Sequence, residues 1–169
     1  YDDALYLHSN PRFFHRRFEL ADLVLSGSDD LLAYARAHAP RVRKWEAPLD
    51  LNYYRPYRSN KTGGSRAVVI GWTGTDLNDL NQVAPVLTET AKNLNVRVCV
   101  VGPAMAIPPE LPGMDYIEWS LNNEVANLLN FDIGIMPLAD NEYNRAKEGY
   151  KLKQYMAVEG MSEVRPHWR

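Results

Sequence analysis

Apolar residues along the chain fall into two patterns, short continuous runs and longer stretches with apolar positions three and four apart. Short runs rich in β-formers are typical of strands, and they occur at 23–25, 42–45, 67–71, 96–102, 116–118 and 131–135, some of them interrupted by charged residues. The three-and-four spacing predicts amphipathic helices between these runs, over 29–39, 77–94, 121–129 and about 147–157. Strands that alternate with helices predict an α/β fold with a largely parallel sheet and helices on both of its faces.

Local signals mark the ends of two of these helices. Ser28 is a good N-cap, and Asp29 and Asp30 place negative charge where the helix dipole favours it. Ser120 is expected to cap the helix over 121–129 in the same way.

A change of composition divides the chain. Residues 48–66 are rich in proline, glycine and polar residues, which is typical of a linker, so we place a domain boundary there. Residues 1–47 then form a fragment of one lobe, and residues 67–157 form an incomplete second domain. Residues 158–169 show no strand pattern, although a fifth strand is expected after the last helix. We therefore expect the chain to be cut from something longer, with one flank of its sheet unpaired.

Charge and cysteine content exclude several classes of protein. The 169 residues carry 19 basic and 21 acidic side chains, a net charge of −2, which argues against a protein that grips nucleic acid over its whole surface. Cys99 is the only cysteine, so no disulfide can form within the chain, and a reducing compartment is the simpler interpretation. No apolar run approaches the length of a membrane span, and the first residues do not resemble a signal peptide.

Residues 71–75 (GWTGT) follow a predicted strand and precede a predicted helix. Glycines at this place allow a ligand to approach the backbone, and the amides at a helix start suit an anion. The segment is neither the dinucleotide fingerprint, because Thr73 and Asp76 stand where glycine is required, nor a P-loop. A plain turn whose glycines serve packing explains the same residues equally well.

Two lysines at the start of the last predicted helix indicate a second anion site. Lys147 and Lys151 lie four residues apart and so share a helical face, with Arg145 just upstream and Asn144 as a plausible N-cap. Cations at the positive end of a helix are disfavoured by about 0.3–1 kcal/mol each unless an anion is bound there. Gly149, placed mid-helix, costs about 1 kcal/mol, which close approach of a ligand would explain. The alternative is a solvated basic face with an incidental glycine.

The remaining candidates are weaker. Tyr116 and Trp119, near a strand end, are aromatic residues of the kind that stack on a base, but core packing is the favoured interpretation for both. The histidines show no metal-ligand spacing, and the chain contains no Asp-x-Asp sequence.

Several segments together carry a family pattern. They are residues 1–4, 21–28, 48–50, 71–75 (GWTGT), 131–138 (FDIGIMPL), 147–151 (KEGYK) and 154–157 (QYMA). In this order they resemble segments of the bacterial group 1 (family 4-type) glycosyltransferases, over most of the chain up to residue 157. Many relatives carry two glutamates where this chain has Ala146 and Gln154, and the family's usual continuation after Ala157 is absent.

The resemblance implies the GT-B architecture, in which two Rossmann-like domains face each other across a cleft. Residues 67–157 would then be the C-terminal, donor-binding half, and residues 1–47 a fragment of the acceptor-side lobe. The resemblance also implies transfer with retention of configuration and without a metal ion or other cofactor. The substrates it implies are a UDP- or GDP-linked sugar as donor and a glycan or lipid-linked acceptor.

The same resemblance assigns roles by position. Lys147 and Lys151 would neutralise the departing diphosphate, and the other donor-binding residues would be Gly71, Trp72, Thr73, Gly74, Thr75, Asp140, Glu142, Arg145, Gly149 and Gln154. We therefore expect a cytoplasmic glycosyltransferase of polysaccharide biosynthesis. Any membrane contact, at the inner face, is expected through the missing lobe. The alternatives are an inert nucleotide- or phosphate-binding module and a non-functional remnant of such an enzyme.

Overall fold

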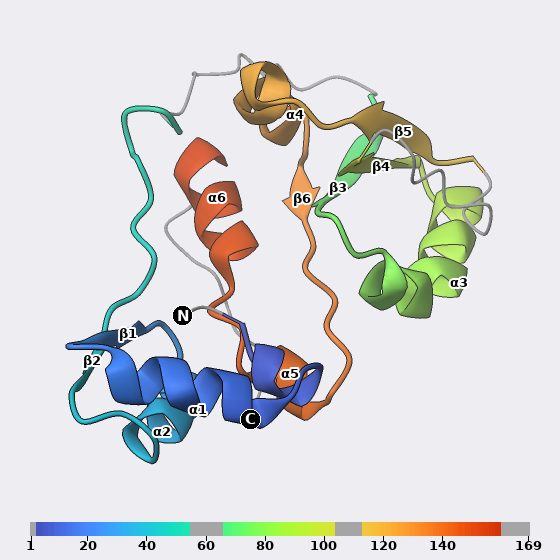
Figure 1. Ribbon diagram of the computed structural model, residues 1–169. Helices are drawn as coiled ribbons and strands as arrows, with labels where there is room; N and C mark the ends of the chain where they lie inside the picture. Colours follow the sequence, from blue (N-terminus) through green and yellow to red (C-terminus); the bar gives the residue numbers. More distant parts are fainter. Residues whose placement is uncertain (1–2, 55–65, 104–112, 160–169) are drawn as a thin grey trace. The chain divides into compact units, whose positions relative to one another are not determined.

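The computed structural model of the protein describes residues 3–54, 66–103 and 113–159 (Figure 1). These residues form two compact units. The first consists of Tyr1–Pro48 together with Ala139–Tyr150, and the second of Leu49–Leu138 together with Lys151–Arg169. The domain boundaries predicted from composition stay predictions. The segment Ala139–Tyr150, which lies far along the chain, belongs to the first unit.

The first unit is a small α/β layer. Its two strands pair in parallel, with Val24 opposite Val42. The N-cap predicted at Ser28 is confirmed, because its hydroxyl accepts the backbone N–H of Leu31 at 3.2 Å. The elements of this unit are a 3-10 helix η1 (Leu5–Leu7), α1 (Pro11–Leu20), β1 (Val24–Ser26), α2 (Asp29–Arg36), β2 (Val42–Lys44) and α5 (Glu142–Arg145).

The second unit contains a four-stranded sheet in which every pairing is parallel and the strand order is β5-β4-β3-β6. Its strands are β3 (Val68–Thr73), β4 (Val96–Gly102), β5 (Asp115–Glu118) and β6 (Ile133–Gly134), and its helices are α3 (Asn78–Asn93), η2 (Leu121–Asn123), α4 (Glu124–Leu129) and α6 (Tyr150–Glu159). The predicted α/β fold with a parallel sheet flanked by helices is confirmed, and it is consistent with a Rossmann-like fold.

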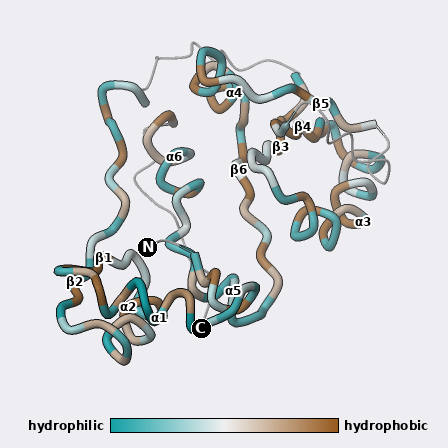
Figure 2. Tube along the Cα trace, in the orientation of Figure 1, coloured by the Kyte–Doolittle hydropathy of each residue, from teal (hydrophilic) through white to brown (hydrophobic). Residues whose placement is uncertain are grey.

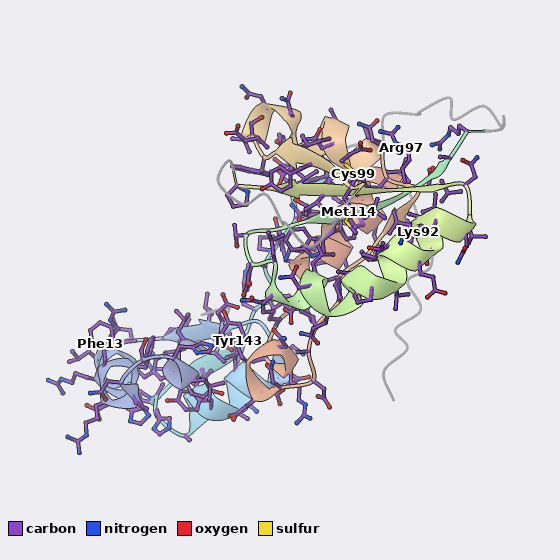
Figure 3. The ribbon with its side chains drawn as sticks, turned by 90° about the vertical axis from the view of Figure 1, so that its right-hand side faces the viewer. Phe13, Lys92, Arg97, Cys99, Met114 and Tyr143 are labelled. Atoms are coloured by element: carbon purple, nitrogen blue, oxygen red, sulfur yellow. The ribbon has the colours of Figure 1, made fainter. Side chains whose placement is uncertain are left out.

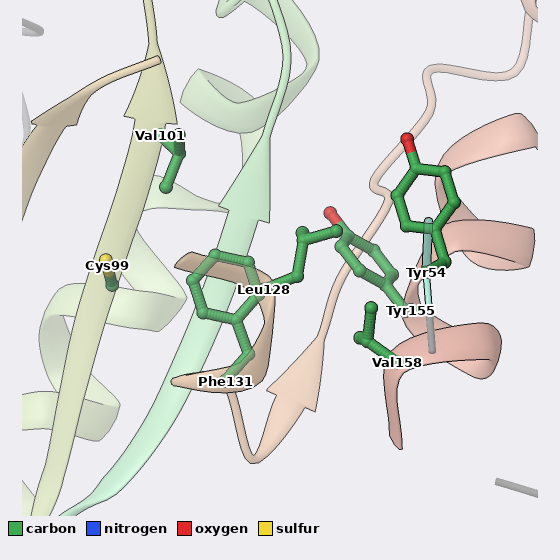
Figure 4. Close-up of a cluster of buried hydrophobic side chains, with 7 residues drawn as sticks. All are labelled: Tyr54, Cys99, Val101, Leu128, Phe131, Tyr155 and Val158. Carbon is green, nitrogen blue, oxygen red and sulfur yellow. The ribbon is translucent and has the colours of Figure 1, made fainter. Parts of the chain in front are cut away.

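Both faces of this sheet are covered, which is why its central strands β3 and β4 are nearly continuous apolar runs. Successive residues of β4 point to opposite faces: Val98 and Val100 pack with α3, whereas Cys99 and Val101 pack with residues of α4 and α6. Figure 2 colours most of β4 as hydrophobic, and Figure 4 shows the cluster on the second face. The sheet therefore has one hydrophobic core on each side.

Two glycines shape the second of these cores. Gly71 of β3 and Gly134 of β6 are paired across the sheet. A Cβ added to Gly71 would lie 2.0 Å from the ring of Phe131, and one added to Gly134 would lie 2.5 Å from the ring of Tyr155. The two rings meet edge to face, with centroids 6.1 Å apart. Because the two glycines have no side chain, the two aromatic rings can pack directly against the backbone of the sheet.

Three sequence predictions need correction. The last helix begins at Tyr150 rather than near residue 147. The strand predicted over 131–135 is shorter: only Ile133 and Gly134 form β6, although the N–H groups of Asp132 and Ile135 on either side also donate to carbonyls of β3, at 2.8 and 2.9 Å. Ser120 makes no capping bond with its side chain, and the helix it was expected to cap starts as a 3-10 turn. The tail beyond Glu159, with its missing fifth strand, lies outside the described residues.

Candidate functional site

The carboxyl ends of three strands meet at one edge of the sheet, where open α/β sheets bind their ligands. At the end of β3, the N–H of Gly74 donates to the carbonyl of Val101 in β4 at 3.0 Å. At the end of β5, the N–H of Trp119 donates to the carbonyl of Gly102 at 2.7 Å. These bonds tie the loops after β3 and β5 to the end of the central strand.

The GWTGT segment lies mostly in the sheet rather than in a loop. Gly71, Trp72 and Thr73 belong to β3 and are buried, with the Trp72 side chain only 2% exposed. Gly71 is a glycine because the ring of Phe131 occupies the space that a Cβ would need. The loop predicted for these three residues is wrong, because they belong to a strand, and packing explains the glycine; their donor-binding role stays a prediction. Only Gly74 and the exposed Thr75 stand beyond the strand.

The start of α3 is less suited to an anion than its position suggests. The side chain of Asp76 already accepts the N–H of Asn78 at 3.0 Å, and Asp79 adds a second carboxylate in the first turn. These carboxylates take the place that the helix dipole offers to an anion. The expectation of available amides at this helix start is therefore wrong for Asn78.

Lys151 of α6 brings a positive charge to the same edge. Its ammonium group lies 5.0 Å from the centre of a ring of Trp72, and 2.6 Å from the point that a Cβ on Gly74 would occupy. The first turn of α6 contains no acidic residue. The positive end of the helix and the charge of Lys151 therefore add at the end of β3, an arrangement that attracts an anion.

Tyr155 explains how α6 is held there. The N–H of Thr73 donates to the Tyr155 hydroxyl at 3.2 Å, and that hydroxyl donates to the carbonyl of Ile135 at 3.2 Å. Burial raises the pKa of this phenol, despite the opposing effect of the Thr73 N–H, so the hydroxyl stays protonated and remains a donor. Because Lys151 lies four residues earlier on the same helical face, this anchor places its stem beside β3. Sequence reasoning missed Tyr155, whose partners are distant in the chain.

Gln154 is enclosed in a polar network rather than exposed at the edge. It is 6% exposed, and its side-chain nitrogen donates to the Tyr54 hydroxyl at 2.7 Å and to Glu124 at 3.2 Å. The Tyr54 hydroxyl also donates to Glu124, at 2.9 Å. The amide of Gln154 thus connects α6 to the start of α4.

The segment before α6 belongs to the first unit. Lys147 and Gly149 precede the helix, so the shared helical face predicted for Lys147 and Lys151 is wrong. The ammonium group of Lys147 lies 5.0 Å from the centre of the Tyr143 ring. Gly149 has a φ of +72°, a conformation that favours glycine, so backbone geometry explains this residue. Glu148 accepts the N–H of Ala47 at 2.9 Å, which fixes the segment within the first unit.

The charged residues predicted to bind the donor in and just before α5 are on the surface of the first unit. Asp140 and Arg145 form an ion pair at 2.7 Å, and both side chains are exposed. Glu142 is the exposed first residue of α5. The capping role predicted for Asn144 at the last helix is wrong, because that helix begins at Tyr150 and Asn144 lies inside α5, where its N–H donates to the side chain of the N-cap Asn141 at 2.8 Å.

Comparison with models of known protein families found no match, and a search of curated proteins found no similar sequence. Within the described ranges, no three histidine, cysteine, aspartate or glutamate side chains are grouped closely enough to hold a metal ion. No helix in the same ranges is long and apolar enough to cross a membrane. The second unit is a Rossmann-like α/β unit, and Lys151 places one positive charge at the carboxyl edge of its sheet.

Proposed function

We propose that the second unit binds the diphosphate of a nucleotide-linked sugar, and that the chain is the donor-binding part of a retaining glycosyltransferase. The observation that carries this proposal is the position of Lys151. Its ammonium group stands at the carboxyl end of β3, at the positive end of a helix whose first turn has no acidic residue. The order of the sequence motifs, which resembles that of the family 4-type glycosyltransferases, supports the same function.

The positive charge of Lys151 would favour the chemistry of sugar transfer. When the bond between the sugar and the diphosphate breaks, negative charge grows on the departing oxygen. A fixed cation and the aligned amides of a helix start lower the barrier if they face that charge. Lys151 would contact the diphosphate in this step. The role predicted for Lys147, which belongs to the first unit, stays a prediction.

Calorimetric titration with UDP, GDP and ADP tests the proposal. The native chain is expected to bind one of them saturably, and Lys151→Ala to bind it at least tenfold more weakly, because a hydrogen bond to a charged group contributes about 1.5–3 kcal/mol. Lys92→Ala is the matched control, since Lys92 lies in the last turn of α3, next to the amino end of β4 (Figure 3). Equal binding by native protein and Lys151→Ala would contradict the proposal, as would a folded native chain that binds no nucleotide.

Turnover distinguishes the two classes of binding protein. When the acceptor-side lobe is supplied, a transferase is expected to pass the sugar to an acceptor hydroxyl or to water and to release the nucleoside diphosphate, whereas an inert binding module holds the nucleotide sugar intact. Chromatography of the reaction mixture separates these products. Intact donor after prolonged incubation with protein that binds it would favour the inert module.

A further inference from the structure

Trp119 is a large aromatic residue left in solvent at the edge where Lys151 lies. It directly follows β5, and 44% of its surface is exposed. The sequence favoured core packing for this residue, and the structure shows that interpretation to be wrong. Tyr116, considered beside it, is half-buried and packs against the core under α3. What distinguishes Trp119 is its place: an accessible indole at the carboxyl edge of the sheet, where open α/β sheets bind ligands, offers a flat aromatic face to a ligand.

The indole of Trp119 is held in a fixed orientation. Its Nε1–H donates to the carboxylate of Glu124 at 3.3 Å, and its backbone N–H donates to Gly102. Glu124 is itself fixed, because it also accepts hydrogen bonds from Tyr54 and Gln154. The indole is therefore anchored through its polar edge and its backbone while much of its surface remains accessible, and such preorganisation lowers the entropy lost on binding.

The same network places Trp119 near the candidate diphosphate site. Gln154, which shares Glu124 with Trp119, lies three residues after Lys151, which is about one turn of α6. In the sheet, β5 and β3 are separated only by β4, so their ends lie roughly 10 Å apart at the usual strand spacing. That separation suits a nucleotide whose diphosphate is at the end of β3 and whose base lies at the end of β5.

We propose that Trp119 stacks on the base of the nucleotide. This inference rests on the proposed function, because it assigns the base of the same nucleoside diphosphate whose diphosphate meets Lys151. Stacking on an indole is available to every base, since each has a π-face, and it contributes affinity without selecting one base strictly. Glu124 acts as a positioning residue that orients the ring.

Affinities of UDP, GDP, ADP and inorganic pyrophosphate for native protein, Trp119→Ala and Trp119→Phe test this assignment. Trp119→Ala is expected to weaken binding of the nucleotide by roughly 5- to 150-fold, the range for one base on an aromatic ring, and to leave pyrophosphate affinity unchanged. Trp119→Phe should recover much of the loss. Trp45→Ala is the control, because Trp45 is 61% exposed and belongs to the first unit.

The outcomes separate this inference from the function on which it rests. Nucleotide affinity that is unchanged in Trp119→Ala overturns the stacking role, while the loss in Lys151→Ala still supports the diphosphate site. An equal loss of nucleotide and pyrophosphate affinity also overturns it, because the substitution then acts through the fold, which circular dichroism would reveal. A native chain that binds neither ligand refutes both proposals.

Discussion

Replacing Gly71 with alanine is expected to destabilise the second unit strongly, although alanine suits the backbone of a strand there. The new Cβ would lie 2.0 to 2.2 Å from three ring atoms of Phe131, where carbon atoms normally stay about 3.5–4.0 Å apart. The ring must therefore retreat by roughly 1.5 Å, and at 1% exposure it has no free space to enter. Overpacking of this kind costs about 1–3 kcal/mol, and the severity of this overlap places Gly71→Ala at the upper end.

A double-mutant cycle isolates the cause. Phe131→Ala alone should cost about 3–5 kcal/mol through the cavity it leaves. In that background the Gly71→Ala methyl group has room, so the double variant should be no less stable than Phe131→Ala. Urea unfolding followed by circular dichroism measures all four proteins, and Phe131→Leu replaces Phe131→Ala if the latter does not fold. A penalty for Gly71→Ala that is nil, or equal in both backgrounds, would refute the packing explanation.

Two further outcomes follow from single residues. Gly149→Ala should lower the free energy of unfolding by about 1 kcal/mol, because a φ of +72° is unfavourable for alanine; unchanged urea midpoints would contradict this. Burial raises the pKa of the Cys99 thiol from 9.0 to about 11, so at pH 8 a thiol reagent should label Cys99 only after unfolding. Rapid labelling of the native protein would disprove the burial. Above pH 9 the unfolded thiol ionises while the folded one does not, so this group should lower the free energy of unfolding as the pH rises from 9 to 11.

The helices and strands of the second unit were predictable because its sheet is buried on both faces. Runs such as Val98–Val101 are apolar at every position, and α3 shows a clean helical spacing, so local pattern and tertiary packing agree. The shortness of β6 could not be predicted, since it depends on how few residues pair with β3 at the edge of the described sheet. The start of α6 was misplaced because Lys147 and Glu148 are good helix formers, and only the backbone angle of Gly149 shows the break.

The candidate site was predictable in part. Lys151 could be singled out as a cation near a helix start, and the structure places it at the edge of the sheet. The anchor through Tyr155 and the network around Glu124 could not be predicted, because they join residues from different parts of the chain. Gly71 was misinterpreted for the same reason. A glycine at the end of an apolar run indicates a ligand-binding loop, but the side chain that requires this glycine belongs to Phe131, sixty positions later in the chain.

The first unit is formed by two distant stretches of the chain, Tyr1–Pro48 and Ala139–Tyr150, so it can be completed during synthesis only when the second stretch has been made. Ala146, 1% exposed, closes a cluster with Ala4 and Leu31, yet it is synthesised after the four described strands of the second unit. Domains generally fold from the N-terminus as they emerge, whereas here the earliest residues must wait for their last partner. Until that segment arrives, the cluster around Ala4 and Leu31 is incomplete, so the first unit reaches its final packing only after the chain of the sheet has been made.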